Sequence, residues 1–241
     1  PPPPPPPPPF FPPHTPPPPS LSGLVGSEMC IRDRSPRANV ALRIAMAALT
    51  SLVTIQWHSA AVSAGEYTGN DPVVAAQAER ALSAFERWRL CGDTVAYLEY
   101  IEVRSETAAQ VAIRTGMLPV EVQNAWAEGD LGGQRAALAA LTQVGVPYKR
   151  YTEEEGVSFD CSGLTGYAWG RAGVDLPRSS RSQYRSADRV DPENARVGDL
   201  AWYPGHIMLY LGVDSLVVHS PVRGRTVEYG LLSEDRAGWV R

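Results

Sequence analysis

The chain has almost no lysine and no excess of basic residues. Lys149 is the only lysine among 241 residues, and the 22 lysines and arginines are outnumbered by 26 acidic residues, for a formal net charge of -4. Domains that bind nucleic acid carry a basic stripe or patch that neutralises phosphates. This composition therefore excludes a nucleic-acid partner and describes an ordinary globular chain of one or two domains.

Long apolar runs are also scarce. The one candidate extends from Ile44 to Ile55 and is shorter than the roughly 20 residues that a membrane-spanning helix needs. Arg37 and Arg43 precede it, and the small residues of Ala60–Ala64 follow it. This pattern predicts a secretory signal peptide over residues 35–64. We therefore expect a protein secreted to the cell envelope, with no membrane span after the signal is removed.

The first 34 residues are dominated by proline. Such a low-complexity tract cannot build a core, and the segment Glu28–Asp33 resembles a translated adaptor from sequencing libraries. We expect residues 1–34 to be a non-native or low-complexity extension, in which Cys30 carries no function.

Cysteine is rare in the remaining chain. Only Cys91 and Cys161 follow residue 64, and no Cys-x-x-Cys pair occurs. Paired cysteines of exported proteins usually form disulfides, and a bridge between these two would silence a nucleophile at Cys161. Gly92 and Asp93 are typical of a helix end and the next helix start. This setting favours an unreactive buried thiol at Cys91.

Residues 65–130 predict a small helical region without strands. Apolar residues recur at helical spacing over Val73–Leu90 and again over Thr94–Val103, which favours a pair of helices packed as a hairpin. The segment from Thr107 to Val122 superficially resembles a helix-turn-helix, but export and the lack of a basic face argue against DNA binding. We expect a packing or interaction module.

The remaining residues, 131–241, predict a second region that mixes helices with short strands. A helix over Gln134–Gln143 should stop at Gly145 and Pro147. Cys161 then begins a helix that ends near Gly173. The N–H groups and dipole of a helix start favour negative charge, which predicts a lowered pKa for the Cys161 thiol. A lone cysteine is more often a small buried residue, but the downstream histidines favour a nucleophile.

Four short strands are expected near the C-terminus: Asp199–Tyr203, Ile207–Leu211, Asp214–His219 and Thr226–Tyr229. A tight turn at Gly212 and Val213 would place His206 opposite His219, with Cβ atoms about 4.5–5.5 Å apart. A turn centred on Asp214 and Ser215 keeps the two histidines on one face but separates them along the ladder.

The first register suits a cysteine nucleophile and two supporting histidines. His206 would accept the thiol proton of Cys161, and His219 would hold the ring of His206. Each histidine has a plainer interpretation, as a loop residue or a polar strand end. Zinc is a further alternative, since Cys161, His206 and His219 are permissible ligands, but no paired ligand spacing supports it.

Several separated motifs in this order resemble the NlpC-type family of papain-like cell-wall cysteine peptidases. They are a Pro-Tyr lead-in, Phe-Asp-Cys-Ser-Gly-Leu, Leu-Pro-Arg-Ser-Ser, Gly-Asp-Leu and Gly-His, located at Pro147–Tyr148, Phe159–Leu164, Leu176–Ser180, Gly198–Leu200 and Gly205–His206. The resemblance covers about residues 134–241. It implies an α+β fold in which the helix of the nucleophile packs on a short antiparallel sheet.

The resemblance also implies an activity. It is hydrolysis of amide bonds in peptidoglycan stem peptides, commonly between D-glutamate and a diamino acid, by Cys161, His206 and His219, without a metal or other cofactor. Residues that would border or bind the substrate are Tyr148, Asp160, Ser162, Arg178 and Gln183. Asp160 has the plainer alternative of capping the helix, and Arg178 that of a solvated loop charge.

The chain departs from the family pattern at Lys149–Glu153, where a Trp-Gly-Gly-like segment is common, so the preferred bond stays open. A muramoyl-L-alanine amidase on the same scaffold is one alternative. A non-catalytic wall-binding protein is another, and an acyl-transfer enzyme acting on lipid or toxin is a third.

Overall fold

The computed structural model describes residues 68–232 and 237–241. The expected extension over residues 1–34 and the expected signal peptide over residues 35–64 lie outside the described residues. Within the described ranges, no helix combines the length and apolar character that a membrane crossing requires.

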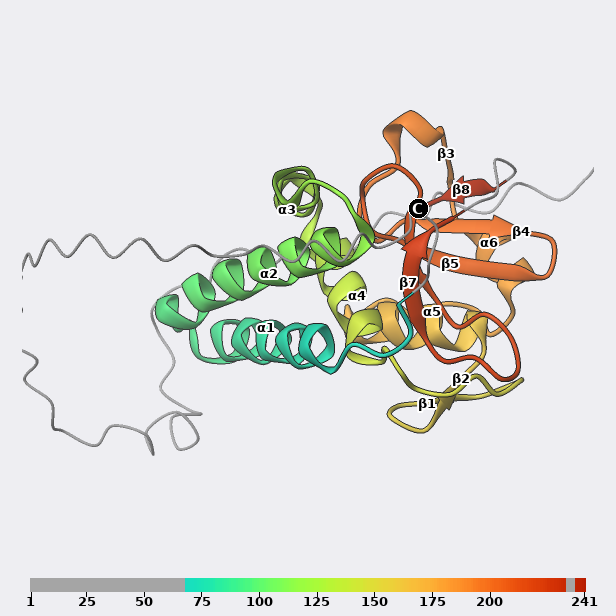
Figure 1. Ribbon diagram of the computed structural model, residues 1–241, viewed down its shortest axis with the longest axis horizontal. Coiled ribbons are helices and arrows are strands. Elements are labelled where there is room, and N and C mark those ends of the chain that lie inside the picture. Colours follow the sequence, from blue (N-terminus) through green and yellow to red (C-terminus); the bar gives the residue numbers. More distant parts are fainter. Residues whose placement is uncertain (1–67, 233–236) are drawn as a thin grey trace, which may run out of the picture. The chain divides into compact units, whose positions relative to one another are not determined.

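Two long helices form the start of the described chain. They are α1 (Pro72–Cys91) and α2 (Thr94–Thr115), and they pack side by side as the predicted hairpin (Figure 1). Gly92 ends α1 in the left-handed region with φ of 66°, and the Asp93 side chain accepts from the first amides of α2. The sequence predicted this junction. The helix α2 continues past Val103 to Thr115, and Gly116, with a left-handed φ of 74°, forms the turn expected after it.

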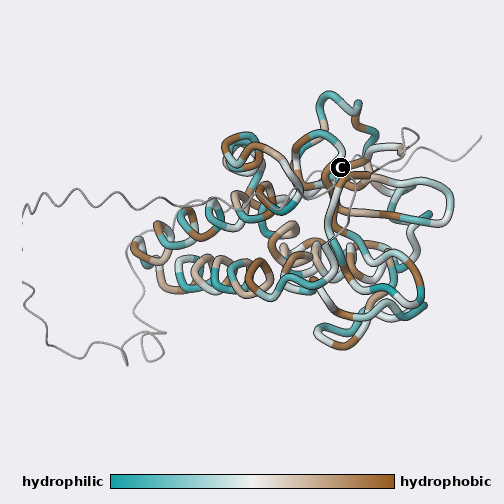
Figure 2. The backbone as a smooth tube through the Cα atoms, viewed as in Figure 1, coloured by the Kyte–Doolittle hydropathy of each residue, from teal (hydrophilic) through white to brown (hydrophobic). Residues whose placement is uncertain are grey.

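Two shorter helices connect this hairpin to the rest of the molecule. They are α3 (Pro119–Glu128) and α4 (Leu131–Thr142), and Asp130 caps α4 by accepting from the amide of Gly133. The tubes of α1 and α2 alternate between hydrophilic and hydrophobic colours (Figure 2), as expected of helices with one buried face. The apolar face of α4 packs against both α1 and α5 (Cys161–Arg171).

An antiparallel sheet of six strands follows, in the order β3-β8-β4-β5-β6-β7. Four of them match the predicted strands, with each end within two residues of the predicted position. They are β4 (Leu200–Tyr203), β5 (His206–Tyr210), β6 (Leu216–His219) and β7 (Glu228–Leu231). The remaining short elements were not predicted from the sequence. These are the edge strand β3 (Arg189–Val190), its neighbour β8 (Gly238–Val240), the small pair β1 (Glu153–Glu154) and β2 (Ser158–Phe159), the helix α6 (Ser180–Ser186) and a 3-10 turn at Pro192–Asn194.

The hairpin between β5 and β6 does not have the predicted register. Its turn holds four residues rather than two, because Leu211 pairs with Leu216 and Asp214 adopts a left-handed φ of 47°. Leu209 lies opposite Val218, so counting outward sets His219 opposite Met208 and not opposite His206. The two histidines are therefore diagonal neighbours, a relation in which Cβ atoms lie about 7–8 Å apart and long side chains still meet.

The helices and the sheet share one hydrophobic core. Trp126 on α3 is fully buried, and its indole N–H donates to the carbonyl of Leu211, 2.8 Å away. The chain just before α1 runs along β7, where Thr68 and Tyr229 exchange two backbone hydrogen bonds. The fold is α+β, with the helix that begins at Cys161 packed on the antiparallel sheet, as predicted.

Trp126 tests whether the helical region and the sheet are energetically coupled. Trp126→Ala removes a fully buried ring and should lower the free energy of unfolding by about 3–5 kcal/mol. Trp126→Phe keeps most of the apolar volume but leaves the Leu211 carbonyl without its donor, and should cost about 1–3 kcal/mol. Urea denaturation followed by circular dichroism measures both. A loss below about 1 kcal/mol for the alanine variant would contradict a shared core.

Candidate active site

Cys161 occupies the first position of α5, where Asp160 fixes the helix start. One carboxylate oxygen of Asp160 accepts from the amide of Gly163 at 2.7 Å, which is the N-cap arrangement. Gly163 is required at that position, since a Cβ there would lie 2.1 Å from the carbonyl oxygen of Thr152. The backbone at Thr152 therefore passes close against the first turn of α5 and holds Cys161 in place.

Asp160 is also the centre of a polar cluster. It is 6% exposed and accepts two hydrogen bonds from the guanidinium of Arg178, at 3.0 and 2.9 Å, and one from the amide of Tyr151. Arg178 donates as well to the hydroxyl of Ser162 and pairs with Glu153. In this structure Asp160 caps the helix and is ion-paired, and Arg178 is the bound partner of that carboxylate.

The two predicted histidines meet. Nε2 of His206 lies 2.8 Å from Nδ1 of His219, and both residues are 6% exposed. Nε2 of His219 in turn lies 3.2 Å from Oε1 of Glu228, which is paired directly with His219 in the β6–β7 ladder. The sequence did not point to Glu228, since a glutamate at the start of a short strand is usually a surface residue.

The thiol of Cys161 lies beside the start of β5. The backbone N–H of Ile207, the residue after His206, donates a hydrogen bond to it. This contact brings Cys161 to the strand that carries His206. The diagonal register, rather than the predicted direct pairing, brings His206 and His219 together, and the thiol of Cys161 lies beside the strand that carries His206.

The expected low pKa of Cys161 is wrong for this structure. Burial raises the pKa of the thiol above its ordinary value, and the carboxylate of Asp160 raises it further. Hydrogen bonds from the backbone amides of Ile207 and Ser162 lower it, but they do not offset the loss of water. The loss of hydration therefore raises the pKa of the thiol by more than the helix start lowers it.

Burial acts on His206 in the opposite sense. Burial and, to a smaller extent, the neighbouring His219 lower the pKa of His206 to about 3. A buried imidazole resists taking up a charge. The resting site therefore holds a neutral thiol and a neutral imidazole, and not an ion pair.

The remaining predicted substrate residues are placed unequally. Tyr148 is half-buried, and burial is the main cause that raises its pKa; a thiolate at the nearby Cys161 would raise it further. Ser162 is buried under Arg178. Gln183 is fully buried, with its amide bonded to the carbonyl of Ser162 and the hydroxyl of Thr165. It lies between α5 and α6 and not at the surface of a cleft.

The geometry leaves no room for a metal between the two histidines. Their facing ring nitrogens are at hydrogen-bond distance, and a zinc ion needs each nitrogen about 2.0–2.1 Å from itself. Among the described residues, no group of three or more potential ligands has a metal-binding arrangement. Cys161 is a free thiol, so no bridge joins it to Cys91. Cys91 is exposed at the end of α1 and is disulfide-bonded, so the expectation of a buried thiol there is wrong.

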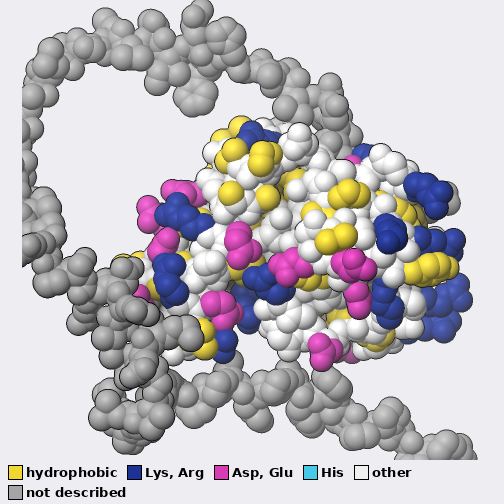
Figure 3. Space-filling view, turned by 90° about the horizontal axis from the view of Figure 1, so that it is seen from below, with side chains coloured by type: hydrophobic (Ala, Val, Ile, Leu, Met, Phe, Trp, Pro, Cys, Tyr) yellow, Lys and Arg dark blue, Asp and Glu magenta, His cyan; other side chains and the backbone are white. Residues whose placement is uncertain are grey.

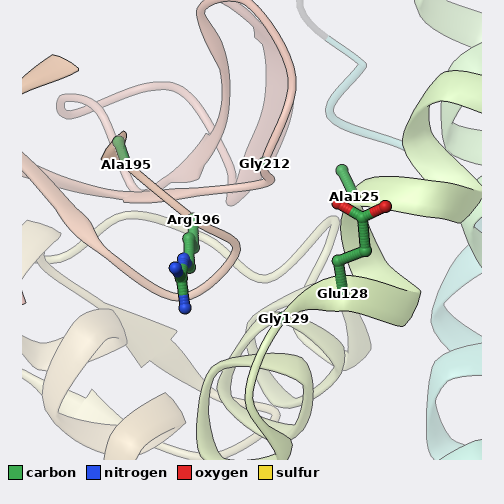
Figure 4. Close-up of a pocket in the computed structure, with 6 residues that line it drawn as sticks. All are labelled: Ala125, Glu128, Gly129, Ala195, Arg196 and Gly212. Carbon is green, nitrogen blue, oxygen red and sulfur yellow. The ribbon is translucent and has the colours of Figure 1, made fainter. Parts of the chain in front are cut away.

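A separate hollow of about 230 Å³ lies at the end of α3 and the loop before β4. It is lined by Ala125, Glu128, Gly129, Ala195, Arg196 and Gly212, and the charged ends of Glu128 and Arg196 do not point toward one another (Figure 4). The lining does not include Cys161, His206 or His219, so the hollow is separate from the candidate active site.

Comparison with known proteins gives a consistent result for this part of the chain. The sequence profile of the NlpC/P60 family matches residues 145–238. Gamma-DL-glutamyl hydrolase from Bacillus subtilis is 33% identical over 113 residues, which are 43% of this chain and 27% of that protein. Peptidoglycan endopeptidase RipB from Mycobacterium tuberculosis is 44% identical over 73 residues, which are 29% of this chain and 30% of RipB.

A solved structure of an NlpC/P60 family protein from Bacillus cereus is 30% identical, with a TM-score of 0.42, and the match covers 45% of this chain and 39% of that one. The chain spans less than a third of the length of the two curated relatives. The family resemblance seen in the motifs is confirmed. Residues 145–238 therefore form an NlpC/P60 domain.

Proposed function

We propose that this protein is a secreted peptidoglycan endopeptidase that uses Cys161 as its nucleophile. The observation that carries the proposal is a free thiol at a helix start, beside the strand that contributes His206 to a hydrogen-bonded histidine pair. Hydrolases of this kind need a nucleophile, a base and a group that orients the base. Cys161, His206 and His219 have the chemistry for these three roles.

The proposed reaction starts from the neutral pair. Nδ1 of His206 takes the thiol proton as the sulfur attacks the amide carbonyl, because Nε2 is already engaged by His219. Backbone N–H groups at the start of α5 would stabilise the oxyanion. His206 then gives its proton to the departing amine, which leaves a thioester on Cys161. Water, deprotonated by His206, releases the acid and restores the thiol.

The proposed substrate is a stem peptide cut after D-glutamate and before a diamino acid. The name of the Bacillus subtilis relative, a gamma-DL-glutamyl hydrolase, favours a glutamyl bond, and that of RipB favours peptidoglycan. Lys and Arg side chains gather at the end of one face that lies away from α1 and α2 (Figure 3). Exposed cations on the segments around Cys161, including Arg150 and Arg181, suit a substrate rich in carboxylates.

The segment that departs from the family pattern lies at the entrance to α5. Tyr151 has a left-handed φ of 66° and is 76% exposed, while its amide is fixed to Asp160. We infer that this exposed ring, rather than a Trp-Gly-Gly-like segment, borders the substrate and sets the preferred bond.

Substitution of the nucleophile tests the activity. Cys161→Ala should abolish the release of fragments from purified sacculi, because the variant lacks the sulfur that attacks the amide carbonyl. Val95→Ala, which changes an exposed side chain of α2, serves as a matched control and should cleave at the wild-type rate. Circular dichroism checks that both variants fold.

Mass spectrometry of the released fragments separates the candidate bonds. Fragments that end in D-glutamate support the proposal, whereas free muramoyl ends would indicate an amidase. Unchanged cleavage by Cys161→Ala would refute the assignment of the nucleophile.

Alkylation by iodoacetamide tests the charge state of the resting site. Since burial raises the pKa of Cys161, the thiolate fraction should be small at neutral pH and increase through pH 9, the ordinary value of a thiol. The rate of modification of the peptide that contains Cys161, followed by mass spectrometry, should increase over the same range. A rate that is already constant below pH 7 would show a resting thiolate and contradict the neutral pair.

A further inference from the structure

Glu228 is a buried carboxylate at the end of the histidine chain. It is 3% exposed, and its oxygens are shared between His219, at 3.2 Å, and the guanidinium of Arg225, at 2.6 and 3.0 Å. A buried charge is costly unless it is paired and hydrogen-bonded. Both partners of Glu228 meet this need, so the carboxylate can remain ionised within the protein.

The surrounding backbone holds Glu228 firmly. A Cβ on Gly69 would lie 3.5 Å from Oε2 of Glu228 and 2.7 Å from the hydroxyl of Thr226, so the chain before α1 passes directly over this carboxylate. On the other side, the amide of Tyr148 donates to the carbonyl of Arg225 at 2.9 Å. Glu228 and Arg225 therefore lie between two fixed segments.

The chemistry of these groups determines the position of each hydrogen. An ionised carboxylate only accepts hydrogen bonds, so Nε2 of His219 must carry a hydrogen to donate to Glu228. In neutral His219 the other nitrogen, Nδ1, is then an acceptor. Nε2 of His206 must accordingly carry a hydrogen and donate it to His219. Nδ1 of His206 is left with a free lone pair, which is the form that a base requires.

We propose that Glu228 is a positioning residue for the reaction: it sets the tautomers of both His219 and His206 and offsets the positive charge that forms on the pair when His206 takes the proton of Cys161. This inference rests on the proposed function for its effect on rate. Its effect on the tautomers does not depend on catalysis and can be measured in the resting protein.

Arg225 moderates this effect. Its side chain is 47% exposed, whereas that of Glu228 is 4% exposed, so its charge is partly screened by water and only partly cancels the carboxylate. Other titratable groups around the histidine pair are Tyr203, whose ring centre is 5.3 Å from that of His206, and Cys161 and Asp160 at the start of α5. Glu228 is the acidic group among them that is hydrogen-bonded to the pair.

Glu228→Gln tests the proposal with almost no change of shape. The amide of glutamine can donate to Nε2 of His219, which favours the opposite tautomer and places a hydrogen on Nδ1 of His206. The kcat should fall at least about 10-fold, while the KM changes by less than about 3-fold, because a wrong tautomer impairs the base and not the binding. Glu228→Asp keeps the charge and should recover part of the loss.

The tautomers can be read directly by NMR of protein with 15N-labelled histidine, in the Cys161→Ala background. The parent should show a protonated Nε2 and an unprotonated Nδ1 on both rings, and Glu228→Gln should reverse or mix these signals. Arg223→Gln, a change of an exposed arginine in the same loop, is the matched control and should leave the spectrum unchanged.

A titration of the same samples gives a test with two signs. Glu228→Gln should shift protonation of the pair to lower pH, because the imidazolium loses its carboxylate. Arg225→Gln should shift it to higher pH, because the carboxylate loses its competing cation. Parent tautomers in Glu228→Gln, or shifts of the same sign in both variants, would overturn the proposal. Failure of the proposed function would appear separately, as wild-type protein that releases no fragments from sacculi or as cleavage that survives loss of Cys161.

Discussion

The pairing of three antiparallel strands, β5, β6 and β7, is the constraint on which the site depends. A register shift of one residue moves every side chain of a strand to the other face. The observed register sets His219 directly across from Glu228 and one diagonal step from His206. Each of these side chains is buried, so each must find its partner inside the protein. The strand register thus places His206, His219 and Glu228 in a row of hydrogen-bonded side chains.

Burial serves this row in two ways. It shields the short contacts from water, which makes them electrostatically stronger, and it disfavours charge on both Cys161 and His206. The helix start alone would favour a thiolate, and the low pKa that we predicted for Cys161 from the sequence took only this effect into account. The depth of a side chain is a property of the whole fold, and burial outweighs the local dipole at Cys161. Both groups are thereby neutral in the resting protein.

The parts of the site that the sequence predicted are those with local causes. Asp160 and Gly163 mark the start of a helix by cap chemistry and tight packing, so the position of Cys161 could be inferred from its neighbours. The register of the hairpin could not be inferred in this way. Asp214 adopts a left-handed conformation in a four-residue turn, and the amino-acid sequence of this turn is also compatible with shorter turns. Glu228 was missed for the same reason: its role arises only from strand pairing and burial, neither of which leaves a motif.

The position of the helical region follows from the same sheet. The segment before α1 pairs with Tyr229 and covers Glu228 through Gly69, and the hydroxyl of Thr226 donates to the carbonyl of Gly69 at 2.8 Å. Asp71, which caps α1, accepts in addition from the hydroxyl of Tyr229. The start of the helical hairpin is thus bonded to the strand that carries the carboxylate. These contacts make the segment before α1 a support of the strand that carries Glu228.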